Sequence, residues 1–175
     1  LTVDGVTRTE QFDLLKDPRL TEVTQADFVA QFDLAMAVHA RFNDATMAVT
    51  RIRALRGEVD DRVQSAADVQ VTQAGTALAT NLRDVEGDLY EGGAEAQSDL
   101  KHFGTRLANH LSYLKGVVMG ADARPTQQSF QVLEEISVEL DAHLERLELI
   151  LGDELDRFND LLREKGLPPV GRLIA

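Results

Sequence analysis

Apolar residues recur at intervals of three, four or seven positions along most of the chain, the spacing of one face of an α-helix. The first stretch follows Thr24, a residue type suited to cap a helix just before Asp27. Its apolar face is formed by Phe28, Phe32, Ala35, His39, Phe42, Val49, Ile52, Leu55, Val59 and Val63. This pattern predicts one long amphipathic helix. Gly57 lies inside it at a cost of about 1 kcal/mol relative to alanine, which leaves open a kink or an early end.

Three further stretches repeat the helical spacing. The second includes Val71, Ala74, Leu78, Leu82, Val85 and Leu89, and we expect it to stop at Gly92-Gly93. The third includes Leu100, Phe103, Leu107, Leu111, Leu114 and Val118, and we expect Gly120 to end it. The fourth is the most regular and continues to Gly166, with Phe130, Leu133, Leu140, Leu144, Leu147, Leu151, Leu155, Phe158 and Leu162. Four helices are therefore predicted.

The length of the fourth stretch predicts how the helices pack. At 1.5 Å per residue, roughly 40 residues make a rod about 60 Å long, which needs other long helices beside it to bury its apolar face. We therefore predict a mainly α fold: an antiparallel up-down four-helix bundle over residues 24–175, with two long and two shorter helices. Residues 166–170 contain two prolines, cannot continue a helix, and are expected to fold back along the end of the bundle.

The first 16 residues have a different pattern from the rest. Asp4-Gly5 lies between β-branched residues on both sides, which is a strong signal for a β-hairpin because both residues tolerate positive φ. We expect its second strand to run from Val6 to Leu15. A lone hairpin is marginally stable, so residues 1–16 are predicted to be the remnant or end of a larger β-sheet domain that begins before Leu1, or to pack against a partner. Residues 17–23 form the linker, because Pro18 breaks the strand.

Composition and charge exclude several classes of function. The formal net charge is −12, so the chain would repel nucleic acid and an anionic membrane surface. No apolar run approaches the roughly 20 residues that a membrane-spanning helix needs. The chain has no cysteine, which excludes disulfides and thiolate metal sites. Only 5% of residues are aromatic, so the core must consist of Leu, Val, Ile and Ala.

The sequence contains no constellation that is typical of a catalytic, cofactor or metal site. Among its acidic residues, the group Asp153, Glu154, Asp156 and Asp160 is best explained as a solvated helix face. Metal sites in helical bundles use Glu-x-x-His pairs, whereas Glu139 and His143 are one residue too far apart. Each of the histidines that we considered, His39, His102 and His110, is interpreted as a core-edge or surface residue. We therefore predict no catalytic residue, no cofactor and no metal.

Several short motifs together resemble a known kind of protein region. They are Leu1-Thr2-Val3-Asp4-Gly5, Asp17-Pro18-Arg19, Gln31-Phe32, Ile52-Arg53 and Gly166-Leu167-Pro168-Pro169. Their order and spacing resemble the C-terminal region of bacterial exported proteins with sortilin-like or BNR-type β-propeller repeats, often labelled glycoside hydrolases. The resemblance implies the end of a β-sandwich followed by a helical tail, and an extracytoplasmic (periplasmic or secreted) location. Any sugar-cleaving role would belong to the propeller, whose repeats this sequence lacks.

From these patterns we predict a non-catalytic structural or protein-interaction module. It would be the tail of an exported propeller protein or an accessory subunit docked on a larger assembly, and its partners would be other proteins or its own upstream β domains. The alternatives are an auxiliary domain of a carbohydrate-active enzyme and a metal-binding helical bundle. Because the long helices should project beyond the short ones, we expect an uncovered end of the bundle to provide the protein contact. Its residues are Leu155, Phe158, Leu161 and Leu162.

Overall fold

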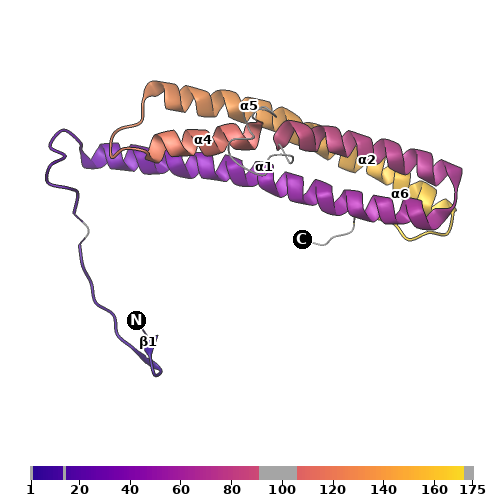
Figure 1. The fold of residues 1–175 in the computed structure, drawn as a ribbon, viewed down its shortest axis with the longest axis horizontal. Helices are drawn as coiled ribbons and strands as arrows, with labels where there is room; N and C mark the ends of the chain where they lie inside the picture. Colours follow the sequence, from indigo (N-terminus) through magenta and orange to yellow (C-terminus); the bar gives the residue numbers. More distant parts are fainter. Residues whose placement is uncertain (1, 14, 91–105, 172–175) are drawn as a thin grey trace.

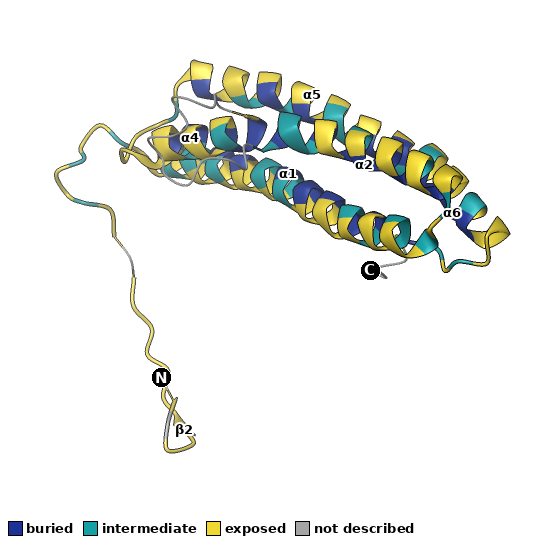
Figure 2. Ribbon diagram, turned by 45° about the vertical axis from the view of Figure 1, so that its right-hand side comes forward, coloured by how far each residue is buried: buried dark blue, intermediate teal, exposed yellow. Residues whose placement is uncertain are grey.

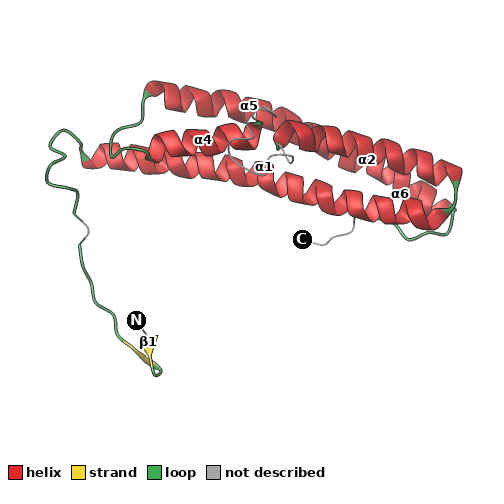
Figure 3. Cartoon of the chain, viewed as in Figure 1, coloured by secondary structure: helices red, strands yellow, loops and turns green. Residues whose placement is uncertain are grey.

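The computed structural model describes residues 2–13, 15–90 and 106–171, and these residues form a helical bundle (Figures 1 and 3). The helices are α1 (Gln25–Ala66), α2 (Val69–Leu89), α4 (Leu107–Met119), α5 (Gln127–Leu149) and α6 (Leu155–Glu164). A short π-helix, η1 (Ile150–Glu154), joins α5 to α6 without a break. The predicted fourth helix is therefore one long rod, formed by α5, η1 and α6, and α1 is the other. Two long and two shorter helices are present, as predicted.

The two long rods run in the same direction. Arg51 Nη1 on α1 lies 2.8 Å from Glu148 Oε1 on α5, and Arg41 pairs with Asp141 about two to three turns earlier on the two helices. Residue numbers thus increase together along the pair. The rods come into contact where α5 crosses α1, and α4 lies between them at the end of the bundle where α5 begins (Figure 1).

Helix α2 runs in the opposite direction to both rods. Asn81 Nδ2 donates to Glu154 Oε2 at 2.7 Å, whereas Asp88, seven residues later, lies 3.5 Å from His143 Nδ1. The partner numbers fall as those of α2 rise, so α2 is antiparallel to the long rod.

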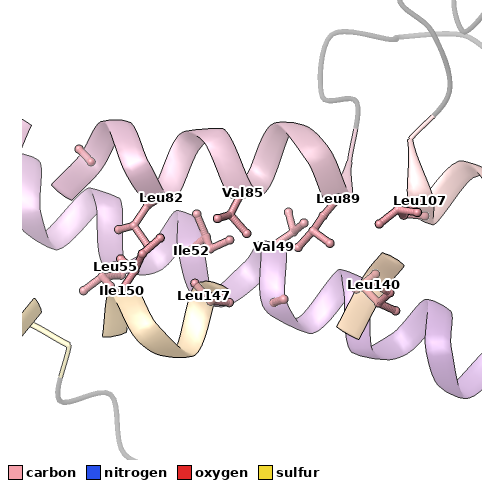
Figure 4. Packing of buried hydrophobic residues seen from close by; sticks show 14 of the residues in the cluster. Val49, Ile52, Leu55, Leu82, Val85, Leu89, Leu107, Leu140, Leu147 and Ile150 are labelled. Atoms are coloured by element: carbon pink, nitrogen blue, oxygen red, sulfur yellow. The ribbon is translucent and has the colours of Figure 1, made fainter. Parts of the chain in front are cut away.

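Helix α4 continues in the direction of α2 instead of reversing it. Its last residues lie beside the first turns of α1, since the side-chain amide of Gln31 donates to Val118 O at 2.7 Å, and its first residue, Leu107, lies near Leu89 in the middle of the bundle (Figure 4). The predicted up-down-up-down alternation is therefore wrong. Helix α2 has 21 residues and α4 has 13, so they are about 32 and 20 Å long, whereas the 42-residue α1 is about 63 Å long. The two short helices can cover most of α1 only if they lie end to end.

The core runs along the axis of this arrangement and is built from aliphatic side chains, as the composition indicated (Figures 2 and 4). At its centre it contains Val49, Ile52 and Leu55 of α1, Leu82, Val85 and Leu89 of α2, Leu107 of α4, Leu140 and Leu147 of α5, and Ile150 of η1. Gly75 of α2 faces Val63 of α1 and Phe158 of α6. A Cβ there would stand 2.4 Å from Val63 Cγ2 and 3.3 Å from the Phe158 ring, so glycine is the residue that fits without a shift.

Local side-chain chemistry fixes the helix ends. At the start of α1, Asp27 N–H donates to Thr24 Oγ1 at 3.2 Å and Thr24 N–H donates to Asp27 Oδ2 at 2.9 Å. This is a capping box and it confirms the predicted cap. At the turn after α1, Asp68 Oδ1 accepts the Gln70 and Val71 N–H groups at 2.8 and 3.1 Å and begins α2.

Asp68 provides a prediction for acid pH. Its bond to Lys165, followed by those to the Val71 and Gln70 N–H groups, holds the pKa of this carboxyl below its ordinary value of 3.8. A lowered pKa means that the stabilisation by Asp68 is fully present above pH 3.8 and is lost as the pH falls through the folded-state pKa. We expect the Asp68 Cγ resonance in an NMR titration to have a midpoint below 3.8, and Lys165→Met to raise that midpoint. A midpoint that Lys165→Met leaves unchanged would contradict the role of the ion pair.

The N-terminal hairpin is much shorter than expected. Strand β1 (Thr2–Val3) pairs antiparallel with β2 (Val6–Thr7) across a turn in which Asp4 and Gly5 have φ of 52° and 78°. Residues 8–13 have no regular structure, and Phe12 is exposed, so the expected strand to Leu15 is wrong. Neither strand contacts a helix in the described part of the chain (Figure 1). Two strands alone offer too little apolar contact to extend the pairing.

The C-terminal residues 166–171, which we call the C-terminal clasp, fold back onto the bundle as predicted. Gly166 has a φ of +71°, and Leu167 N–H donates to Leu162 O at 2.8 Å, which is the bond of a Schellman motif. Val170 is then buried, and its N–H and C=O both bond the side-chain amide of Asn159, at 2.8 and 3.1 Å. The clasp thereby runs back along α6 and packs beside its first half.

Candidate functional site

The residues predicted to make the protein contact are part of the core. Leu155, Phe158 and Leu162 are 8%, 2% and 0% exposed, and Leu161 is half-buried. The expectation of an uncovered end is wrong because α2 runs alongside α6 and the C-terminal clasp covers the remaining seam. Any protein contact must use other surfaces.

A groove lies between α4 and α5, and we call it the α4–α5 groove. It has a volume of about 1120 Å³. Its floor contains the buried Leu114, the buried Ile136 lies on its α5 side, and its rim carries Tyr113, Val117 and Val132, which are 77%, 52% and 39% exposed. The full lining is Asn109, His110, Ser112, Tyr113, Leu114, Gly116, Val117, Thr126, Gln128, Ser129, Val132, Glu135, Ile136 and Glu139. Within the described residues the groove is thus open to solvent, with an apolar floor and apolar side chains on its rim.

The groove exists because α4 has two apolar faces. One face, with Leu107, Leu111 and Val118, is buried, while Tyr113 and Val117, four residues apart, form a second row that points outward. On α5, Val132 and Ile136 have the same spacing and border the groove from the other side.

The turn between α4 and α5 is fixed to the start of α1, which sets the position of both helices. The Gln31 amide donates to Val118 O at 2.7 Å and to Ala121 O at 2.6 Å. Arg124 Nη1 lies 3.3 Å from Asp27 Oδ1. These bonds connect both ends of the turn to one rigid helix, so the mouth of the groove is preorganised.

The charge of the groove is acidic. Glu135 and Glu139 on α5 belong to the lining, and the lining contains no lysine or arginine. Both carboxylates are exposed, and within the described residues neither has a hydrogen-bond or ion-pair partner. Glu86, by contrast, lies between Arg53 and Arg56 at 2.5 Å from each.

The opposite end of the bundle has a comparable seam, between α1 and α6, that the chain closes itself. Val170 of the C-terminal clasp packs into it, Gly171 N–H donates to Glu58 Oε2 at 2.9 Å, and the remaining hollow is only about 340 Å³. No described residue covers the α4–α5 seam in this way. The two ends of the bundle therefore differ in how completely their apolar surface is buried.

A second exposed apolar surface lies on the first half of α1. Val29, Phe32, Met36 and Met47 are 48%, 64%, 48% and 63% exposed, and their spacing puts them on one face of the helix. We call them the outer stripe. The buried residues of this half, such as Val38, lie on the opposite side.

The candidates for metal or catalytic chemistry do not come together. Glu139 borders the groove, whereas His143 lies against Asp88, and His39 is exposed. His110 is on the groove rim, and His102 lies outside the described residues. Of the acidic group on η1 and α6, Glu154 accepts a hydrogen bond from Asn81 and Asp160 pairs with Arg163. Residues 2–13, 15–90 and 106–171 contain no cluster of three or more His, Asp or Glu residues that could hold a metal ion.

Sequence reasoning missed the groove because it followed only the dominant apolar stripe of each helix. The available signal was the off-stripe apolar residues, Tyr113 and Val117 on α4 and Val132 on α5. The expected helix start at Leu100 and Phe103, and the expected stop at Gly92-Gly93, lie outside the described residues. Within the described helices, none is both long and apolar enough to cross a membrane.

Comparison with known proteins gives this chain no relative. A scan of protein-family models, a search of curated proteins and a search of solved structures each found no match. The resemblance to the tail of exported propeller proteins therefore stays a prediction, and function must be argued from the α4–α5 groove and the surfaces around it.

Proposed function

We propose that the chain is a non-catalytic protein-interaction module whose docking site is the α4–α5 groove. The observation that supports this proposal most directly is an apolar groove, open to solvent, at one end of a bundle whose other end is closed by its own C-terminal clasp. Apolar surface left exposed in a rigid groove is typical of binding sites for other macromolecules.

The dimensions of the groove favour a helix as its occupant. Its lining extends from Asn109 to Val117 on α4 and from Thr126 to Glu139 on α5, or about 12 and 20 Å of helix. Small-molecule sites of roughly 300–1,000 Å³ enclose most of their ligand. This groove is larger, is bordered by exposed side chains, and runs between two helices, so a third helix can lie along it.

Site-specific crosslinking tests the docking site. We expect p-benzoylphenylalanine in place of Tyr113 to crosslink one partner in cells of the native source, and Val117→Glu in the same chain to abolish that product, because a charge enters the apolar rim. The control replaces Gln73, an exposed residue of α2, with the same crosslinker. The partner is identified by mass spectrometry and confirmed by the reciprocal crosslink from its own surface. Equal crosslinking from position 73, no product from position 113, or insensitivity to Val117→Glu would each refute the proposal.

The wider setting that we propose is the tail of an exported propeller protein, or an accessory subunit of a larger assembly, outside the cytoplasm. Its support is the set of motifs from Leu1-Thr2-Val3-Asp4-Gly5 to Gly166-Leu167-Pro168-Pro169. Fractionation of native cells, with immunodetection of this chain, tests the location. Recovery in the cytoplasmic fraction would overturn this part of the proposal and leave the groove unaffected.

A further inference from the structure

We infer that the occupant of the α4–α5 groove is an amphipathic helix whose apolar face is flanked by lysine or arginine. The inference rests on the proposed function and adds the chemistry of the partner to it. Two features of the groove support this inference: the arrangement of its apolar residues, and the two carboxylates beside them.

The apolar residues fit one face of a helix. Tyr113 and Val117 on α4, and Val132 and Ile136 on α5, are pairs with a spacing of four residues, so each pair forms a ridge of about one turn. Leu114 lies between the ridges at the floor. A helix with apolar residues at positions i, i+3, i+4 and i+7 places them against both ridges and the floor.

The carboxylates decide the charge of the occupant. Glu135 and Glu139 are four residues apart on α5, so they project from the same side of that helix, next to the ridge of Val132 and Ile136. Since no described residue pairs with either, both charges are free to meet a cation on an incoming helix. An acidic helix would be repelled at the same place.

The charges of this chain disfavour a second copy of itself in the groove. Its net charge is −12, and the outer stripe on α1 has the exposed Asp33 at its edge. Docking that stripe would bring this carboxylate toward Glu135 and Glu139. A basic partner helix is the complementary choice.

Matched peptides test the inference with the full chain. The probe is a fluorescein-labelled amphipathic peptide of about 18 residues, or five turns, with leucine on one face and lysine along both edges of that face. The comparison peptide has glutamate in place of every lysine. By fluorescence anisotropy, we expect the lysine peptide to bind at least about tenfold more tightly, and the difference to shrink as salt is raised to about 0.5 M.

Paired charge reversals distinguish the groove from general attraction to an acidic protein. In Glu135→Lys/Glu139→Lys we expect the preference to invert in favour of the glutamate peptide. Asp60→Lys/Asp61→Lys changes the net charge by the same amount on an exposed part of α1 remote from the groove, and should leave the preference intact. Val117→Glu should weaken both peptides. Equal effects of the two reversals, no binding of either peptide, or binding that Met36→Glu on the outer stripe removes and Val117→Glu does not, would each overturn the inference.

The two tests fail independently. Crosslinking from position 113 to a partner helix without flanking cations would leave the proposed function standing and refute the basic helix. Charge-selective peptide binding without a native crosslink from position 113 would support the groove chemistry and refute the proposed function.

Discussion

Phe158→Ala is expected to lower the free energy of unfolding by about 3–5 kcal/mol, the largest effect among the substitutions considered. Phe158 is 2% exposed, and its ring lies 3.3 Å from where a Cβ of Gly75 on α2 would stand. Removing the ring leaves a cavity in which the backbone of α2 cannot collapse further, because the helix is held on both sides by its contacts with α1 and α6. Since domains of this size are stable by only about 5–15 kcal/mol, the variant should be close to unfolding at physiological temperature.

Urea denaturation followed by circular dichroism at 222 nm measures the effect of Phe158→Ala. The matched control is Phe32→Ala, which removes the same atoms from a side chain that is 64% exposed on the outer stripe. We expect the control to change stability by less than about 1 kcal/mol. Similar losses in the two variants would mean that Phe158 is not in the core, and would revive the sequence-based expectation that this end of the bundle is uncovered.

Asn159→Asp is expected to lower the free energy of unfolding by about 2–3 kcal/mol at neutral pH, because one buried hydrogen bond becomes a repulsion. Asn159 is buried, accepts from Val170 N–H at 2.8 Å and donates to Val170 C=O at 3.1 Å. An ionised aspartate keeps the first bond but turns a negative oxygen toward the Val170 carbonyl. The C-terminal clasp should therefore loosen and expose the seam between α1 and α6.

The effect of Asn159→Asp should depend on pH. Burial and the facing carbonyl favour the protonated acid, which can donate to Val170 O, so the introduced carboxyl has its pKa raised above the ordinary value of about 3.9. A raised pKa means that the variant's deficit is smallest below about pH 4 and grows as the pH rises through the folded-state pKa. The control, Asn43→Asp on the exposed face of α1, makes the same chemical change without burial. A deficit that is constant from pH 4 to 7, or shared by the control, would contradict this reading of the clasp.

The two ends of the bundle differ in how completely their apolar side chains are buried. This difference separates the residues that determine stability from those proposed to bind a partner. At the α2–α6 end, Phe158, Gly75 and Val170 fill the space between helices, and Asn159 locks the C-terminal clasp in place. At the α4–α5 end, apolar side chains remain exposed around a groove. We therefore expect core substitutions at the first end to change stability, and groove substitutions such as Val117→Glu to change binding with little change in stability.

Sequence alone determined the features that depend on neighbours along the chain. Helical spacing predicted the long first and fourth helices, and the composition predicted an aliphatic core. Thr24 and Asp27 predicted the start of α1, and Gly166 with the prolines after it predicted the C-terminal fold-back. Each of these follows from a few consecutive residues, because capping bonds, positive φ and missing N–H groups are local interactions.

Tertiary structure alone decided what each apolar face is packed against. A periodic apolar stripe on a helix requires burial but does not specify what buries it. The sequence of α6 is therefore compatible with a core position and with a protein contact. The structure shows that α2 and the C-terminal clasp cover Phe158. The direction of α4 likewise depends on how two short helices share the length of α1. The α4–α5 groove depends on residues such as Tyr113 and Val132, which lie about 20 positions apart on different helices. Such pairings are set by the sum of many weak contacts across the whole molecule, and no local pattern records that sum.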